Sequence, residues 1–189
     1  MIKLKDILVE IITSSDIVYH GSVQDFETFD TNKSNFRGTI YFTTDKNFAI
    51  GFTKDREGRK PIIYHCKLNI KKPFDPENQE NLDLLRPIIT QLIQSKYKDP
   101  ITDANFLIPN SIYVDGNEIQ NPSLEQTTNW YIWRIKHGSW RILEGEKILN
   151  TIKEKGFDAL ITKERGAKNI AVFDPKKIQI VKKEYLWLN

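Results

Sequence analysis

Short runs of β-branched and aromatic residues alternate with short helical patterns along this chain, so the pattern predicts a mixed structure. Strands are expected at residues 16–22, 39–44, 61–70 and 157–162, and one or two more between 169 and 188. β-branched and aromatic residues fit a pleated, half-buried surface. Because the strands are short and few helices separate them, we predict an α+β domain with a mostly antiparallel sheet.

Two short helices are marked by their end signals. In the helix at 45–53, Asp45 is the expected N-cap, and Phe48, Ile50 and Phe52 are expected to turn inward. A second helix is expected at 146–155, where a glycine follows and stops it.

The middle of the chain is harder to assign. Residues 81–97 show helical spacing of leucine and isoleucine, although Pro87 must kink that helix or mark its real start. Residues 98–126 are rich in turn formers and weakly periodic, which predicts a long loop or an insertion. We therefore treat 81–126 as an insertion of uncertain structure. Three of the four tryptophans follow it and are expected to build helical packing.

The length of 189 residues predicts one domain with one sizeable core. Residues 1–14 place their apolar side chains at helical spacing, which predicts an amphipathic N-terminal helix that precedes a single domain at 15–189. No apolar run approaches the roughly 18–20 residues that span a membrane, so no membrane association is expected. Cys66 is the only cysteine, which excludes an internal disulfide and favours a reducing, cytoplasmic location.

Neither the net charge nor a search for common catalytic motifs indicates a function. A formal net charge of +3 permits an anionic partner without arguing for one. The sequence shows no phosphate loop, Rossmann glycine pattern or serine-histidine-aspartate set. His65 and Cys66 are adjacent in a predicted strand and so point to opposite faces, and we expect no metal site.

Four separated motifs occur in a recognisable order. They are "YHGS" at 19–22, "GTIYFTTDKNFAIGF" at 38–52, "GFDALITKE" at 156–164 and "NIAVFDPKKIQIV" at 169–181. Together they resemble mono-ADP-ribosyltransferases of the histidine-tyrosine branch, which includes diphtheria toxin and the poly-ADP-ribose polymerases. The likeness is closest to the ADP-ribosyltransferase domains in polyvalent proteins of phages and mobile elements. It implies an α+β fold in which two small, mostly antiparallel sheets flank a cleft.

The resemblance assigns the first motif to NAD, which would be a substrate. His20 would bond a ribose hydroxyl, and Gly21 would offer backbone groups to the nicotinamide amide, with Ser22 beside them. The chemistry suits these roles, because a neutral imidazole both donates and accepts, and glycine lets a planar ring approach the backbone. Without the resemblance, His20 is typical of a histidine that merely ends a strand.

The second motif would hold the nicotinamide ring. The resemblance places Tyr41 against one face of the ring and Phe52 against the other. Two aromatic rings supply apolar burial and orientation without any charge. Ala49 stands where relatives often have a serine that bonds the nicotinamide amide. Taken singly, both aromatic residues are typical of a core.

The last two motifs depart from the family pattern. Loss of nicotinamide leaves oxocarbenium character on the ribose, which a carboxylate stabilises. Asn169 stands where the toxins and polymerases carry a catalytic glutamate, and Glu164 is the nearest upstream acid. In phage-type relatives a non-acidic residue at this place often accompanies an upstream glutamate. The resemblance therefore implies a catalytic set of His20, Tyr41, Glu164 and Asn169.

Two functions from different classes follow from the resemblance. In the first, the protein cleaves NAD and transfers ADP-ribose to an acceptor. The acceptor is a protein, a nucleic acid or water, and a protein is favoured over a nucleic acid. With water as the acceptor, the protein would be an NAD glycohydrolase. In the second, it is a catalytically inactive module of a phage or mobile element that binds NAD, ADP-ribose or a protein. A toxin-like protein of a phage would act in the host bacterial cytoplasm.

Overall fold

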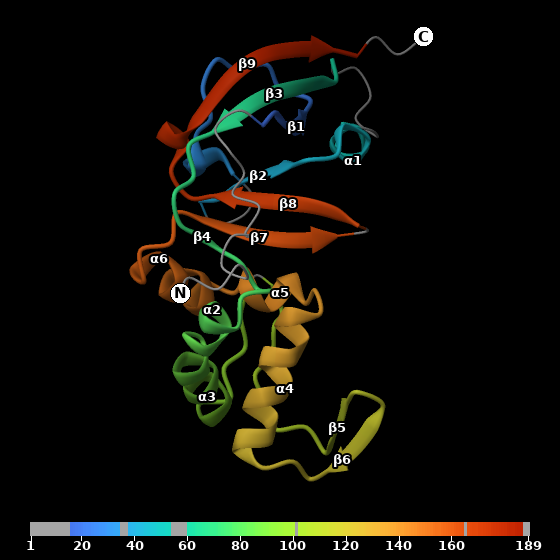
Figure 1. Cartoon of the computed structure of the whole chain (residues 1–189), viewed down its shortest axis with the longest axis vertical. Coiled ribbons are helices and arrows are strands. Elements are labelled where there is room, and N and C mark those ends of the chain that lie inside the picture. Colours follow the sequence, from blue (N-terminus) through green and yellow to red (C-terminus); the bar gives the residue numbers. More distant parts are fainter. Residues whose placement is uncertain (1–15, 35–37, 54–59, 101, 165, 187–189) are drawn as a thin grey trace, which may run out of the picture. The chain divides into compact units, whose positions relative to one another are not determined.

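A computed structural model describes residues 16–34, 38–53, 60–100, 102–164 and 166–186 (Figure 1). The described residues form two compact units, one made of the stretches up to residue 72 and from 166 onward, the other of 73–164. The amphipathic helix predicted at 1–14 lies outside the described residues. Among the helices of the described stretches, none combines the length and the apolar character needed to cross a bilayer.

The first unit contains five strands that pair in the order β8-β2-β1-β3-β9, and every pairing for which the register is defined is antiparallel. Its elements are β1 (Val18–Ser22), the 3₁₀ turn η2 (Thr31–Lys33), β2 (Ile40–Thr43), α1 (Lys46–Gly51), β3 (Ile62–Leu68), β8 (Ala167–Val172), η3 (Pro175–Lys177) and β9 (Ile178–Tyr185). The predicted mostly antiparallel character is therefore present in this unit.

The pairing of β1 is strongly unequal on its two sides. With β3 it pairs over all five of its residues, whereas with β2 it shares a single register position, Tyr19↔Thr43. Beyond that position β1 and β2 are no longer paired, and His20 and Gly21 lie on the stretch of β1 where the pairing has ended. The five strands nevertheless remain hydrogen-bonded neighbours in one sheet, and the pairing of β1 with β2 is the least extensive among them.

Helix α1 begins as the sequence predicts and packs differently. The Asp45 carboxylate accepts hydrogen bonds from the backbone N–H groups of Asn47, at 2.8 Å, and Phe48, at 3.3 Å, which is an N-cap. The residue that this helix buries is Ala49. The expectation that Phe48, Ile50 and Phe52 turn inward is wrong for Phe52, which is 63% exposed, and the other two are only half-buried. A six-residue helix has too few turns to bury an aromatic stripe.

The second unit contains a helical core and two small β pairs. Strands β4 and β7 pair in parallel, and β5 and β6 form an antiparallel hairpin. Its elements are β4 (Pro73–Phe74), α2 (Gln79–Asp83), α3 (Arg86–Gln94), β5 (Ser111–Val114), β6 (Asn117–Gln120), α4 (Leu124–Lys136), α5 (Trp140–Leu143), α6 (Glu146–Glu154) and β7 (Ala159–Glu164). The described chain is thus a mixed α+β structure (Figure 1).

The segment 81–126 is more ordered than the sequence pattern indicates. Its single predicted helix is two helices, and Pro87 lies in the first turn of α3, where the missing N–H costs no hydrogen bond. The predicted long loop contains the β5–β6 hairpin, whose turn is Asp115-Gly116 with φ angles of 49° and 82°. Positive φ at both turn residues matches the twist of a two-residue hairpin.

Candidate functional site

The imidazole of His20 has a defined tautomer in this structure. Its Nδ1 lies 2.7 Å from the backbone carbonyl oxygen of Tyr41. A carbonyl only accepts, so Nδ1 carries the proton and donates it, which leaves Nε2 of the neutral ring as an acceptor. Burial lowers the pKa of His20, and the hydrogen bond to Tyr41 opposes that shift only in part. The ring is therefore neutral at pH 7, with Nε2 able to accept a hydroxyl proton.

Four aromatic rings surround that imidazole. Phe29 meets it edge-on at 5.1 Å between ring centroids, and Phe42, Tyr64 and Phe26 lie at 5.7, 6.2 and 6.4 Å. These rings remove water from the histidine, which is the physical cause of its lowered pKa. Such surroundings suit a structural histidine as well as a binding one, so the cage alone does not decide the role of His20.

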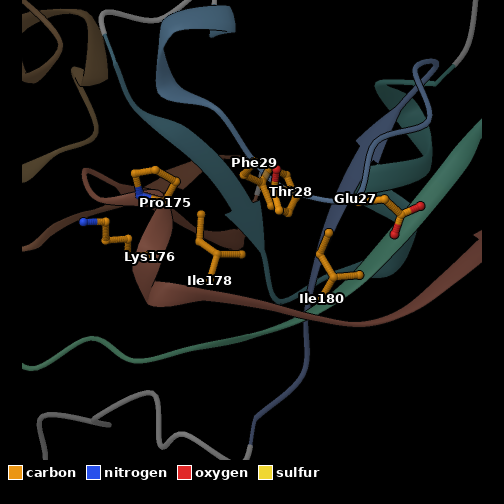
Figure 2. Close-up of a pocket in the computed structure, with 7 residues that line it drawn as sticks. All are labelled: Glu27, Thr28, Phe29, Pro175, Lys176, Ile178 and Ile180. Atoms are coloured by element: carbon orange, nitrogen blue, oxygen red, sulfur yellow. The ribbon is translucent and has the colours of Figure 1, made fainter.

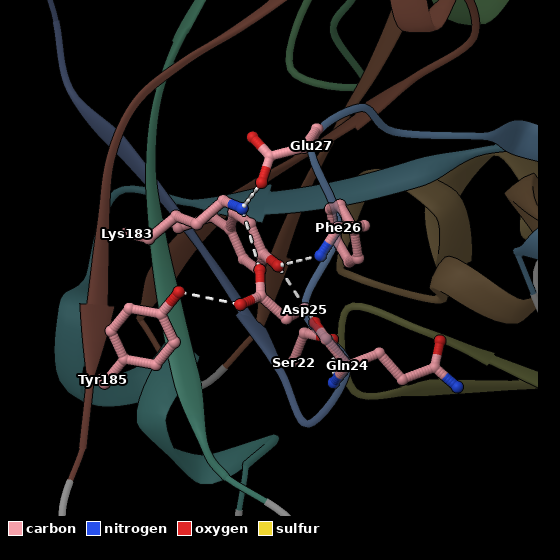
Figure 3. A network of polar contacts seen from close by, with 8 residues as sticks. Ser22, Gln24, Asp25, Phe26, Glu27, Lys183 and Tyr185 are labelled. Carbon is pink, nitrogen blue, oxygen red and sulfur yellow. Dashed lines mark hydrogen bonds and ion pairs between the residues drawn. The ribbon is translucent and has the colours of Figure 1, made fainter.

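A polar network holds the loop that supplies two of those rings (Figure 3). The Lys183 ammonium on β9 donates to Asp25 Oδ1 at 2.8 Å and to Glu27 Oε1 at 2.5 Å, and the Tyr185 hydroxyl donates to Asp25 Oδ2 at 2.7 Å. The hydrogen bonds from Lys183 and Tyr185 lower the pKa of Asp25. The same two carboxylates raise the pKa of Lys183.

The hydroxyl of Tyr64 completes this attachment. It donates to the backbone carbonyl of Gln24 at 3.0 Å and accepts from the backbone N–H of Phe26 at 2.9 Å. The rings of Phe26 and Tyr64 stack at 4.3 Å with an interplanar angle of 6°. Residues of β3 and β9 thereby fix the loop 24–29 next to His20. Sequence patterns missed this network, because the charges that form it are 156 and 158 positions apart.

Gly21 is required by the packing of α1 on β1. A Cβ built at this position would lie 2.1 Å from the backbone carbonyl oxygen of Ala49 and 3.1 Å from Cγ2 of Thr53. The nearer of these atoms is backbone and has no rotamer with which to move away. The question why glycine follows His20 thus has a structural answer that needs no ligand, and the role of Gly21 toward nicotinamide stays a prediction.

The other side chain of the first motif forms a local turn. Ser22 Oγ accepts from the backbone N–H of Gln24 at 3.0 Å and lies 3.2 Å from the carbonyl oxygen of the same residue. The hydroxyl therefore initiates the loop 24–29. Its predicted contact with NAD is untested by this arrangement.

Tyr41 and Asn169 share one face of the β2–β8 pair. Thr43 pairs with Asn169 and Tyr41 with Ala171, and side chains alternate along each strand. Phe42 belongs to the opposite face, and it is Phe42 that the His20 ring contacts. The structure therefore brings His20 to the backbone of Tyr41 but not to the side of β2 that carries the Tyr41 ring.

The side chain of Asn169 contains a buried polar atom that makes no hydrogen bond with a described residue. The residue is only 6% exposed, and its Oδ1 is buried without a hydrogen-bond partner among the described residues. Buried acceptors in native proteins are nearly always paired, and leaving one unpaired costs about 1–3 kcal/mol. This oxygen fits a donor that arrives with a ligand, such as a sugar hydroxyl.

The remaining predicted residues are Phe52 and Glu164. Phe52 caps the C-terminal end of α1, and its exposed ring contacts Phe48 edge-on at 5.3 Å. One aromatic face is therefore available to a ligand. Glu164 is the last residue of β7, is half-buried, and belongs to the second unit.

A hollow of about 300 Å³ lies elsewhere in the first unit (Figure 2). Its lining comprises Glu27, Thr28, Phe29, Pro175, Lys176, Ile178 and Ile180. None of the predicted NAD-binding residues is among them, although Phe29 also contacts His20. Within the described ranges, the histidine, cysteine and carboxylate side chains form no group of three that could hold a metal ion.

Comparison with known families identifies the family of this chain. Residues 15–187 match the family described as ADP-ribosyltransferase in polyvalent proteins. The match covers nearly the whole chain, and the chain belongs to this family. Its general activity is therefore ADP-ribosyl transfer, for which the family uses NAD. No curated protein and no solved structure matches the chain.

Proposed function

We propose that this protein is a mono-ADP-ribosyltransferase that cleaves the bond between nicotinamide and ribose in NAD⁺. The acceptor nucleophile forms a bond to the ribose carbon, nicotinamide leaves as a neutral molecule with the electron pair of the broken bond, and the acceptor releases a proton. The observation that carries the proposal is the tautomer of His20, whose neutral ring presents Nε2 as an acceptor to a ribose hydroxyl beside the end of the β1–β2 pairing.

The remaining roles are proposed from the family resemblance and from the chemistry of each side chain. Phe52 offers an accessible ring on which nicotinamide stacks, and Tyr41 packs against its second face. Asn169 Oδ1 accepts a hydrogen bond from a ribose hydroxyl and so relieves its own lack of a partner. Since an amide carries no charge, the negative charge that favours an oxocarbenium-like ribose comes from Glu164. A protein acceptor is favoured over nucleic acid.

Labelled NAD⁺ tests this proposal. The protein is incubated with NAD⁺ labelled on its adenosine half and a bacterial lysate, and both label transfer and free nicotinamide are measured. We expect transfer with the wild type and a loss of at least tenfold in His20→Ala and in His20→Gln. His137→Gln is the matched control, because that imidazole is exposed and its Nδ1 donates to the backbone carbonyl of Trp133 in its own helix.

The two products separate the alternatives. Nicotinamide release without label on any acceptor identifies an NAD glycohydrolase. NAD⁺ binding without nicotinamide release identifies an inactive binding module and overturns the proposed enzyme. Full activity in Glu164→Gln removes the acid from the mechanism while the role of His20 stands.

A further inference from the structure

The second unit contains a hollow of about 380 Å³ that the proposed chemistry does not use. It lies between the loop 102–105 and the chain from the end of α4 through α5. Arg134, Ser139, Trp140 and Arg141 contribute to its lining. Ligand pockets typically measure about 300–1,000 Å³, so this one suits a small ligand of the size of one nucleotide unit.

The buried Asp99 holds one wall of this hollow in place. Its Oδ1 accepts from the backbone N–H of Thr102 at 2.9 Å, and its Oδ2 accepts from the N–H of Glu146 at 2.8 Å. Its own backbone N–H donates to the carbonyl of Ala104 at 2.8 Å. The loop is thereby tied to the start of α6, and the wall is formed before any ligand arrives.

Tyr131 fixes the same loop from the side of α4. Its hydroxyl donates to the backbone carbonyl of Asn105 at 2.6 Å, and its ring stacks on Phe106 at 5.1 Å between centroids. A fixed pocket loses little conformational entropy when a ligand binds.

The charges that line the hollow are mainly positive. The Arg134 guanidinium lies 4.7 Å from the centroid of Trp130, and that of Arg141 lies 5.4 Å from the centroid of Trp140. Neither guanidinium pairs with a carboxylate anywhere in the described ranges. The acidic member of the lining, Asp103, is itself paired with Lys98 at 3.2 Å. Two arginines that form no ion pair with a described carboxylate therefore line the same hollow.

We propose that this hollow binds a nucleoside phosphate. A guanidinium is a planar fork that matches phosphate oxygens, and Arg134 and Arg141 supply two of them. The half-buried indole of Trp140 supplies a face on which a base stacks. The source of the ligand is a free nucleotide or one nucleotide of a single strand. This inference goes beyond the proposed transferase activity and does not depend on it.

Fluorescence anisotropy of a labelled thymidine oligonucleotide of about ten residues tests the site without NAD⁺. We expect Arg134→Gln and Arg141→Gln each to weaken binding by about tenfold or more, since hydrogen bonds to charged groups are stronger than neutral ones. Trp140→Leu weakens it through lost stacking. Lys136→Gln is the matched control, because it removes one charge from an exposed position of the same helix outside the lining. Thermal melts show that each variant is folded.

The salt dependence and a competitor refine the result. Two phosphate contacts to a single strand predict a slope of about −1.4 for the logarithm of affinity against the logarithm of salt concentration. Competition by adenosine monophosphate identifies a free nucleotide as sufficient, and binding of the oligonucleotide alone identifies a strand.

Four results overturn the proposal. The first three are absence of binding to either probe, an equal loss in Lys136→Gln, and preferential binding of a glutamate-rich peptide. Loss of oligonucleotide binding in His20→Ala also overturns it, because the ligand then occupies the site proposed for NAD. Failure of the transferase assay alone leaves this site intact.

Discussion

Replacing Gly21 with alanine tests the contact between β1 and α1. The new methyl group would lie 2.1 Å from the Ala49 carbonyl oxygen, and real Cβ contacts essentially never fall under 3.0 Å. The two backbones must therefore separate by roughly 0.9 Å or more, the shortfall between those two distances. Overpacking of this kind typically lowers the free energy of unfolding by about 1–3 kcal/mol. For a chain of this size, each kcal/mol lost lowers Tm by about 2–4 °C.

The measurement is urea unfolding followed by circular dichroism, with Gly51→Ala as the matched control. Gly51 is the last residue of α1, and a Cβ there meets nothing within 4 Å. Alanine at a helical glycine stabilises by about 0.4–1 kcal/mol, so the two variants should shift stability in opposite directions. A Gly21→Ala protein whose free energy of unfolding lies within about 0.5 kcal/mol of the wild type would refute the close approach.

The same substitution has a functional consequence. Helix α1 and its C-terminal cap carry Ala49 and Phe52, the residues proposed to meet nicotinamide. A shift of the helix therefore weakens NAD⁺ binding even where the fold survives. We expect Gly21→Ala to raise the KM for NAD⁺ more than Gly51→Ala does, and equal KM values in the two variants would contradict the proposed position of the nicotinamide.

Four further predictions concern single groups. Burial raises the pKa of the Cys66 thiol to about 12, so iodoacetamide at pH 8 should alkylate it only after denaturant is added, as mass spectrometry would show. Lys183→Met should lower the urea midpoint near pH 6, and the gap to the wild type should shrink below pH 3.8, because the pKa of Asp25 is lowered in the folded state and its stabilisation is lost as the carboxylate is protonated. An unchanged gap at pH 3 would contradict this origin. Because the pKa of His20 is lowered in the folded state, the folded protein binds fewer protons than the unfolded chain just below pH 6.5. The free energy of unfolding should therefore fall as the pH falls through that window. For the same reason, the acid limb of the pH profile of nicotinamide release should lie below pH 6.5 rather than above it. Asn169→Leu should lower the free energy of unfolding by less than about 1 kcal/mol, because Oδ1 makes no hydrogen bond with a described residue, while the rate of nicotinamide release falls at least tenfold. A large loss of stability with intact nicotinamide release would show that Asn169 has a structural role and does not bind the ribose.

Local signals in the sequence located much of the secondary structure. The Asp45 cap, the glycine after residue 155 and the alternation in 61–70 place α1, α6 and β3 near their observed bounds. The β5–β6 hairpin also has a local signal, the Asp115-Gly116 pair between two short strands, which the weak periodicity of 98–126 obscured. The break between α2 and α3 lies two residues before Pro87. The proline therefore marked the start of a helix correctly, whereas the prediction of a single helix over 81–97 was wrong.

The candidate site was only partly visible in the same way. Motif order identified the family and singled out His20, because a histidine followed by glycine at a strand end is a local pattern. The aromatic cage around that histidine was not predicted, since Phe26 and Phe29 come from a loop whose position depends on Lys183. The inward burial predicted for Phe52 failed because helical spacing in six residues does not say which face a neighbouring strand covers.

Sequence alone determined which residue types stand at strand ends and helix caps, because these depend on neighbours along the chain. Tertiary structure alone decided that Gly21 accommodates the Ala49 carbonyl, that the Tyr41 carbonyl fixes the tautomer of His20, and that Asn169 Oδ1 is left unpaired. Each of these depends on atoms brought together from elements that are separated along the chain. Distances across a sheet follow from register and packing, which no local pattern encodes.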